Sequence, residues 1–124
     1  MTERELHKAT YGFFNTVLSS DVIWHHAQNE TPYGRTNAKA FKGRDIGSLK
    51  GFPDWVLFWR DVTDTGKVGF IELKAPGKYP SPEQRWFLDA MRQHGHMRAV
   101  CKSLEDVEDK LTAWGVPMKG RVSA

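Results

Sequence analysis

Hydrophobic residues recur along this chain with two different spacings. Over residues 3–18 they fall three or four positions apart, and Thr2 precedes them as a helix cap, so an amphipathic helix is predicted. Over residues 54–60 and 68–74 they run together in short apolar stretches, which is typical of buried strands. The polar, glycine-containing stretch at 64–67 predicts a turn that joins the two strands as a hairpin.

The second half of the chain predicts a helix, a strand and another helix. Ser81 and the proline after it are typical of a helix start, and Gly95 marks the expected end of that helix. A strand is expected at 97–101, and Ser103 caps a last helix that ends at Gly115. The residues that the first of these helices is expected to turn inward are Trp86, Phe87, Ala90 and Met91.

Together with a short strand at 22–24, these elements follow the order helix, strand, hairpin of two strands, helix, strand, helix. Such an alternation predicts an α/β fold in which helices flank a small mixed sheet. A chain of 124 residues is large enough for one hydrophobic core but not for two. We therefore expect a single domain over residues 1–117, followed by a loose tail at 118–124.

Composition favours a packed globular protein over other classes. Hydrophobic residues make up 40% of the chain, with five Trp and seven Phe, which argues against disorder. No apolar stretch approaches the roughly 20 residues that cross a bilayer, and the polar N-terminus does not resemble a signal peptide. The single cysteine, Cys101, follows two apolar residues and is expected to be a reduced core thiol. These features predict a cytoplasmic protein that does not enter the membrane.

Positive charge is concentrated in one segment of the chain. The formal net charge is only +3, yet residues 31–50 contain five basic residues against a single acid, Asp45. They lie in a polar stretch, residues 26–52, whose length is uncommon inside a compact domain and in which a short helix is expected at 38–41. A basic segment suits a phosphate backbone, although a solvated loop explains the charge equally well. The basic residues are Arg35, Lys39, Lys42, Arg44 and Lys50.

Two carboxylates and a lysine are expected to meet at one end of the hairpin. Side chains alternate along a strand, so Glu72 and Lys74 share a face at the end of the second strand. Asp54 opens the first strand, and a hairpin that closes near residues 63–66 places position 54 roughly opposite position 74 or just beyond it. Asp54 and Glu72 can therefore converge on a divalent cation, Mg²⁺ or Mn²⁺, with Lys74 beside the phosphate. Taken alone, the Glu-x-Lys pattern is more often the solvated end of a frayed strand.

A third acid lies on the first predicted helix. At about 100° per residue, Glu3 falls within the same arc as the apolar residues of that helix, whereas Glu5 lies off the arc and serves the capping pattern. An acid on a buried face needs a partner, so Glu3 is the better candidate to reach the metal. The other interpretation, a first-turn acid favoured by the helix dipole, remains open.

Several short motifs resemble the VRR-NUC family of the PD-(D/E)xK nuclease superfamily. They are Gly51-Phe52-Pro53-Asp54, Ile71-Glu72-Leu73-Lys74, Lys78 and Ser81-Pro82-Glu83-Gln84. The likeness covers roughly residues 3–114, and the order of elements fits the restriction-endonuclease-like αβββαβα core of that superfamily. The Glu3-Arg4-x-Leu6 start is also similar to the first-helix acid of archaeal Holliday-junction resolvases. Phe52 departs from the family, which usually has a small apolar residue there.

The resemblance implies a role for each residue of these motifs. It makes Asp54 and Glu72 the metal ligands, with the main-chain carbonyl of Leu73 as a further ligand. It makes Lys74 the catalytic lysine, and Glu3 an acid that acts directly or through water. Gln84 matches a glutamine that lies near the family's site, beside its role in capping the helix.

The resemblance also implies a substrate and partners. The expected activity is that of a divalent-metal-dependent endonuclease acting on branched or structured DNA, such as a Holliday junction or flap, in replication or repair in a bacterium or phage-infected host. Likeness to stand-alone members and the small domain favour a homodimer. Two alternatives stay open: a nucleic-acid-binding module without cleavage, and a small interaction protein whose polar strand ends are incidental. The candidate DNA contacts are Asn29, Arg35, Lys39, Lys42, Arg44, Lys50 and Lys78.

Overall fold

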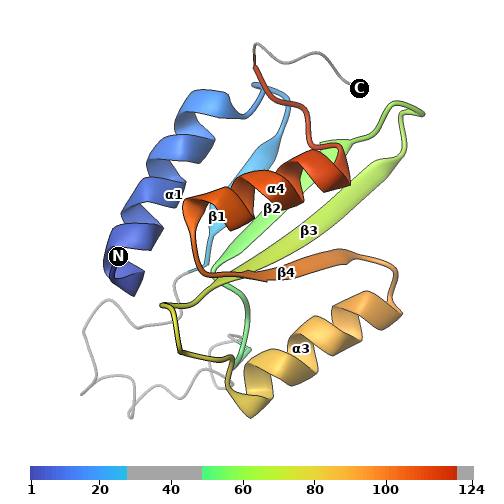
Figure 1. Cartoon of the computed structure of the whole chain (residues 1–124). Coiled ribbons are helices and arrows are strands. Elements are labelled where there is room, and N and C mark those ends of the chain that lie inside the picture. The colour runs from blue at the N-terminus through green and yellow to red at the C-terminus, as the bar shows by residue number, and fades with distance from the viewer. Residues whose placement is uncertain (28–48, 120–124) are drawn as a thin grey trace.

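The computed structural model describes residues 1–27 and 49–119 (Figure 1). Their elements follow the predicted order of helix, three strands, helix, strand and helix. The helices are α1 (Glu3–Val17), α3 (Pro82–Gln93) and α4 (Leu104–Trp114), and the strands are β1 (Ile23–His26), β2 (Trp55–Arg60), β3 (Gly66–Leu73) and β4 (Met97–Cys101). The expectations that lie outside the described residues are the short helix at 38–41 and the DNA contacts Asn29, Arg35, Lys39, Lys42 and Arg44.

A mixed sheet with the strand order β1-β2-β3-β4 forms the centre of the described fold. β1, β2 and β3 are antiparallel neighbours, whereas β4 runs parallel to β3 because α3 provides the crossover between them. The prediction of an α/β fold with a small mixed sheet flanked by helices is therefore confirmed.

The β2–β3 hairpin has a register two residues away from the expected one. Trp55 pairs with Ile71, and the same register continued by one residue sets position 54 opposite position 72 instead of 74. The difference arises in the turn, where the carboxylate of Asp61 accepts hydrogen bonds from two main-chain N–H groups. Because this turn occupies residues 61–65, Gly66 already belongs to β3. The shift brings Asp54 directly across from Glu72.

Helices cover both faces of the sheet. α1 and α4 lie together against one face (Figure 1), and there Phe14 and Leu111 are fully buried in the larger core. α3 covers the other face with a smaller cluster, in which Phe70 packs edge-on against Phe87. Because side chains alternate along β3, Leu73 belongs to the larger core, whereas Glu72 is on the α3 side with Phe70.

α3 turns a different set of residues inward from the one expected. Phe87 and Leu88 are buried, whereas Trp86 is 64% exposed, so the prediction that Trp86 faces the core is wrong. Two residues along a helix differ in direction by about 200°, so burial of Leu88 turns Trp86 toward solvent. Ala90 and Met91 are partly buried, as the edge of an inward arc should be.

The chain beyond α4 stays attached to the fold as far as Lys119. Met118 forms a β-bridge with Leu18, and the main-chain N–H of Lys119 donates to the carbonyl of Val17 at 2.6 Å. The expected loose tail therefore does not begin at 118, and residues 120–124 lie outside the described part of the chain.

Two expectations about environment can be compared with the described residues. Cys101 is buried, and its burial raises the pKa of the thiol to about 12, so it stays protonated as a core residue. Across residues 1–27 and 49–119, no helix is long and apolar enough to cross a membrane.

Candidate active site

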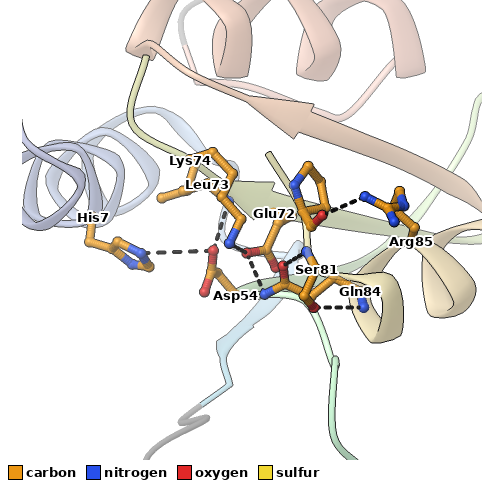
Figure 2. Close-up of polar contacts among 9 residues, drawn as sticks. His7, Asp54, Glu72, Leu73, Lys74, Ser81, Gln84 and Arg85 are labelled. Carbon is orange, nitrogen blue, oxygen red and sulfur yellow. Dashed lines mark hydrogen bonds and ion pairs between the residues drawn. The ribbon is translucent and has the colours of Figure 1, made fainter. Parts of the chain in front are cut away.

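Four polar residues from three elements meet at one end of the sheet (Figure 2). Asp54 stands directly before β2, Glu72 is near the end of β3, and Lys74 follows that strand. The first turn of α3 adds Gln84. The residues that the sequence placed together are thus brought together, apart from Glu3.

The Asp54 carboxylate is held against the neighbouring strand. Its Oδ2 accepts a hydrogen bond from the main-chain N–H of Leu73 at 2.7 Å. The main-chain carbonyl of Asp54 accepts a hydrogen bond from the N–H of Ala27 at 2.8 Å, which ties the same residue to the end of β1. The main chain of Asp54 is thus fixed to β1, and its carboxylate is fixed to the end of β3 next to Glu72.

Glu72 is a carboxylate buried almost completely, with 2% of the residue exposed. Its Oε2 accepts a hydrogen bond from Gln84 Nε2 at 3.1 Å and lies 3.4 Å from Lys74 Nζ. Its Oε1 is buried and has no hydrogen-bond partner within the described residues. Burial raises the pKa of Glu72 to about 8, the nearby charge of Asp54 adds to the rise, and the ammonium of Lys74 opposes it.

A close carboxylate pair with an unsatisfied buried oxygen is costly unless a proton or a cation neutralises it. A divalent cation with hard oxygen ligands fits this pair. The main-chain carbonyl of Leu73 stays a prediction as a further ligand. Within the described ranges, no group of three or more His, Cys, Asp or Glu side chains is arranged to hold a metal ion. A cation here would therefore take its remaining ligands from the main chain and from water, as Mg²⁺ commonly does.

Lys74 is fixed by both its main chain and its side chain. Its main-chain N–H donates to the carbonyl of Cys101 at 3.0 Å, which extends the β3–β4 pairing by one residue. Its side chain is only 16% exposed and ends at the ion pair with Glu72. The ammonium group therefore stands at the carboxylate pair, where negative charge on a bound phosphate would gather.

Gln84 joins the helix start to the carboxylates with the two ends of one amide. Its Oε1 accepts a hydrogen bond from the N–H of Ser81 at 2.8 Å, which completes the capping box of α3. Its Nε2 donates to Glu72. The capping motif thus fixes the amide group that holds the Glu72 carboxylate in place.

α1 presents His7 to the carboxylates. Nε2 of His7 lies 3.8 Å from Oδ2 of Asp54, and its Nδ1 is buried without a hydrogen-bond partner among the described residues. Glu3 lies one turn earlier on the same face and is exposed, so its expected place on the buried face is wrong. The periodicity of α1 identifies the correct face of the helix. On that face, however, the turn that lies beside Asp54 is the second one, which carries His7, and not the first one, which carries Glu3. A direct role for Glu3 stays a prediction.

An imidazole pair extends from His7 to the end of β1. The His7 and His26 rings meet edge-on with their centroids 5.4 Å apart, and His26 lies 4.4 Å from the ring of Trp55. The pKa of His26 is lowered, first by its burial and then by the neighbouring His7. Sequence reasoning gave these histidines no role at the site. The signal that could have found His7 is its i+4 spacing from Glu3.

Two of the candidate DNA contacts fall within the described residues. Lys50 has a largely exposed side chain whose Nζ lies 3.5 Å from Oε1 of Glu83, so part of its charge is already balanced. Lys78 is exposed on the turn between β3 and α3. Both remain predictions as DNA contacts.

Comparisons with known proteins bear on the fold and on the family. A solved structure described as a VRR_NUC domain protein superposes with a TM-score of 0.69 and 18% sequence identity, covering 92% of this chain and 88% of that chain. A search of curated protein sequences found no match. The model of the VRR-NUC domain family matches residues 19–105, a stretch that contains Asp54, Glu72, Lys74 and Gln84 but begins after α1. The chain therefore belongs to the VRR-NUC domain family, within the PD-(D/E)xK nuclease superfamily, and this membership implies a nuclease-like function.

Proposed function

We propose that this protein is a divalent-metal-dependent endonuclease that hydrolyses phosphodiester bonds in DNA. The observation that carries the proposal is the buried carboxylate of Glu72, which faces Asp54, contacts Lys74 and has an unsatisfied oxygen. A structural protein gains nothing from this costly arrangement, whereas a cation-binding site needs it.

Each residue of the site has a defined task in this proposal. Asp54, Glu72 and the carbonyl of Leu73 would hold Mg²⁺ or Mn²⁺. When bound, the cation supplies a Lewis acid beside the scissile phosphate. Gln84 keeps the Glu72 carboxylate in one orientation through its 3.1 Å hydrogen bond. Lys74 stabilises the negative charge that develops on the phosphate.

The proposed substrate is branched or structured DNA, with the protein acting as a homodimer in replication or repair. Support comes from the resemblance of the motifs to stand-alone members of the family and from the basic residues between 31 and 50. Because one small domain carries one site, two copies would be needed to cut both strands of a junction.

A cleavage panel tests the proposal directly. Plasmid, flap and four-way-junction DNA are incubated with the protein in Mg²⁺, Mn²⁺ or EDTA, and products are resolved on denaturing gels. We expect metal-dependent cleavage that is strongest on a branched substrate. In Lys74→Ala, the rate of cleavage should fall by about 100-fold or more. The matched control is Lys67→Ala, because Lys67 lies on β3, the strand that Lys74 follows, but pairs with Asp61 at the far end of the hairpin.

The result that contradicts the proposal is equally clear. If no substrate is cut in either metal, and Asp54→Ala binds DNA as tightly as the unmodified protein, the chain is a nucleic-acid-binding module that keeps the fold without the chemistry.

A further inference from the structure

A groove of about 460 Å³ lies between α3 and β4, next to the candidate active site. Its apolar lining comes from Pro80, Leu88 and Val100, and two guanidinium groups, those of Arg85 and Arg98, border it. In Figure 2, Arg85 lies beyond Ser81 and Gln84, on the side away from His7. The groove is therefore distinct from the carboxylate cluster, although the same helix borders both.

The groove carries net positive charge. Among the described residues, no carboxylate forms an ion pair with Arg85 or Arg98. Arg85 Nη1 donates to the neutral carbonyl of Pro80 at 3.0 Å, which aims the guanidinium without cancelling its charge. The one acid of the lining, Asp89, is already bonded by Arg92 at 3.0 Å and by Gln93 at 3.2 Å. An anion is thus the complementary ligand.

The groove continues directly from the carboxylates. Glu72 of β3 pairs with Val100 of β4, and neighbouring strands are about 4.8 Å apart, so the floor of the groove begins one strand away from Glu72 on the same side of the sheet. The five residues from Arg98 of β4 to Lys102, the residue after that strand, span about 13 Å in extended conformation. A chain-like ligand, in contrast to a single small anion, can therefore contact both the groove and the site.

The residue directly before Pro80, which lines the groove, carries an exposed aromatic ring. Tyr79 lies in the segment that joins β3 to α3, and 73% of the residue is exposed. Nζ of Lys102 lies 4.2 Å from the centroid of its ring, which holds the ring from one side. Positively charged grooves with an aromatic ring are the usual means of binding single-stranded nucleic acid, because unpaired bases stack on the ring. Bases within a duplex are already stacked on one another.

We propose that the α3–β4 groove binds an unpaired strand of the DNA substrate next to the scissile phosphate, with Arg85 and Arg98 on phosphates and Tyr79 stacked on a base. This inference rests on the proposed nuclease function and narrows its substrate class to DNA with a single-stranded arm, such as a flap or fork. The groove then selects substrates by the presence of that arm, whereas the carboxylate site acts on any phosphodiester placed in it.

Binding without cleavage tests this proposal. Fluorescence anisotropy is measured in EDTA with a labelled oligothymidylate and with a blunt duplex of the same length. The double variant Arg85→Ala/Arg98→Ala should lose at least tenfold in oligothymidylate affinity and less than threefold in duplex affinity. Its slope of log K against log salt on oligothymidylate should become shallower by about 1.4, because two phosphate contacts are lost.

Control variants separate this role from general charge and from misfolding. Arg60→Ala/Lys110→Ala removes the same charge from the hairpin end and from α4, and should bind both DNAs as the unmodified protein does. Arg85→Lys/Arg98→Lys keeps the charge and should recover most of the affinity. Tyr79→Ala should lower oligothymidylate affinity at least fivefold, whereas Tyr79→Phe should not.

Three outcomes overturn the proposal: no loss of affinity in the arginine double variant, equal losses on oligothymidylate and duplex, or displacement of oligothymidylate by an oligoglutamate peptide as readily as by unlabelled DNA.

The result of the binding experiment is independent of catalysis. If the expected binding pattern holds but the cleavage panel is negative, the nuclease function fails and the groove stands. If cleavage occurs without the pattern, only the groove fails.

Discussion

Glu72 is the residue on which burial, charge and hydrogen bonding act most strongly. Burial and the neighbouring Asp54 raise its pKa to about 8, while Lys74 opposes the rise. Gln84 and Lys74 both reach Oε2, which leaves Oε1 without a partner among the described residues. Without a bound cation, the folded protein therefore holds this carboxyl protonated over a pH range in which the unfolded chain has lost the proton.

The sign of the pH effect follows from that difference. Between the ordinary pKa of 4.5 and the folded value of about 8, the folded state binds more protons at Glu72, so the free energy of unfolding falls as pH rises. In EDTA, we expect the melting temperature to fall between pH 6.5 and 8. Glu72→Gln removes the titrating group and should flatten this fall. The melting temperature is measured by circular dichroism as a function of pH. If it falls equally in both proteins, Glu72 is not the titrating group.

His7 gives a second prediction at this scale. Its Nε2 stands 3.8 Å from Asp54, a distance that is too long for a direct hydrogen bond but that a water can bridge. Loss of a group that orients a metal ligand typically costs 10–100-fold in metal affinity, so His7→Ala should weaken Mn²⁺ binding by about tenfold. Isothermal titration measures the effect. His25→Ala is the control, because His25 is exposed on β1, and equal losses in both variants would exclude a specific role for His7.

Sequence reasoning reached these residues unevenly. Asp54, Glu72 and Lys74 come from strand ends joined by a short hairpin, so local spacing is sufficient to bring them together. The place of Gln84 at the site was predicted by the resemblance to the family, because its capping motif alone indicates only a helix start. Periodicity defines the face of a helix but not which turn of that face lies at the site. For this reason it did not indicate His7 and placed Glu3 wrongly. That position depends on packing between α1, α4 and the sheet.

At the scale of elements, the close contact between the start of α3 and the segment before β2 restricts which residue can occupy position 51. Gly51 has φ of +90° and lies so close to α3 that an added Cβ would stand 2.6 Å from the main-chain carbon of Glu83. Only glycine allows both this conformation and this contact. Asp54 follows Gly51 by three residues, and Gln84 directly follows Glu83. The close approach therefore brings Asp54 and Gln84 to the same end of the sheet.

Gly51 and Gly77 have similar φ values, so a comparison of the two separates the strain of a positive φ from the collision with α3. Gly77 has φ of +83° but open space around the position of an added Cβ. Gly77→Ala should therefore cost only the conformational strain, about 1–2 kcal/mol. Gly51→Ala carries the same strain and a collision with main-chain atoms that cannot move aside, so its melting temperature should be clearly lower. Equal melting temperatures would show that α3 yields to the added methyl group.

Local signals predicted where elements begin more reliably than which residues they bury. The serine and proline at the start of α3 form the expected cap, and the left-handed Gly115 ends α4 as predicted. Trp86 is expected to face inward, yet Phe87 and Leu88 are the residues that α3 buries against the sheet. The hairpin register differs because Asp61 organises a turn over residues 61–65, earlier in the chain than the turn at 64–67 that the glycine at position 66 indicated.

At the scale of the whole molecule, the fold gathers chemistry at one end of a small sheet. α1 contributes His7, the β2–β3 hairpin contributes the carboxylates and Lys74, and α3 contributes Gln84 on one side and Arg85 on the groove side. The order of elements and the motifs were sufficient to predict this architecture and the family. The α3–β4 groove was not predicted, because it joins residues of a helix and a strand that no sequence motif connects.

The rate of DNA cleavage as a function of Mn²⁺ concentration is the decisive measurement for a metal-dependent nuclease site at Asp54 and Glu72. The substrate is a labelled flap or four-way junction, and the protein is compared with Asp54→Asn, which keeps the shape of the side chain but removes its charge. We expect saturable, EDTA-sensitive cleavage that is slower by about 100-fold or more in the variant. Cleavage that persists in EDTA, or that proceeds at the same rate in Asp54→Asn, would contradict it.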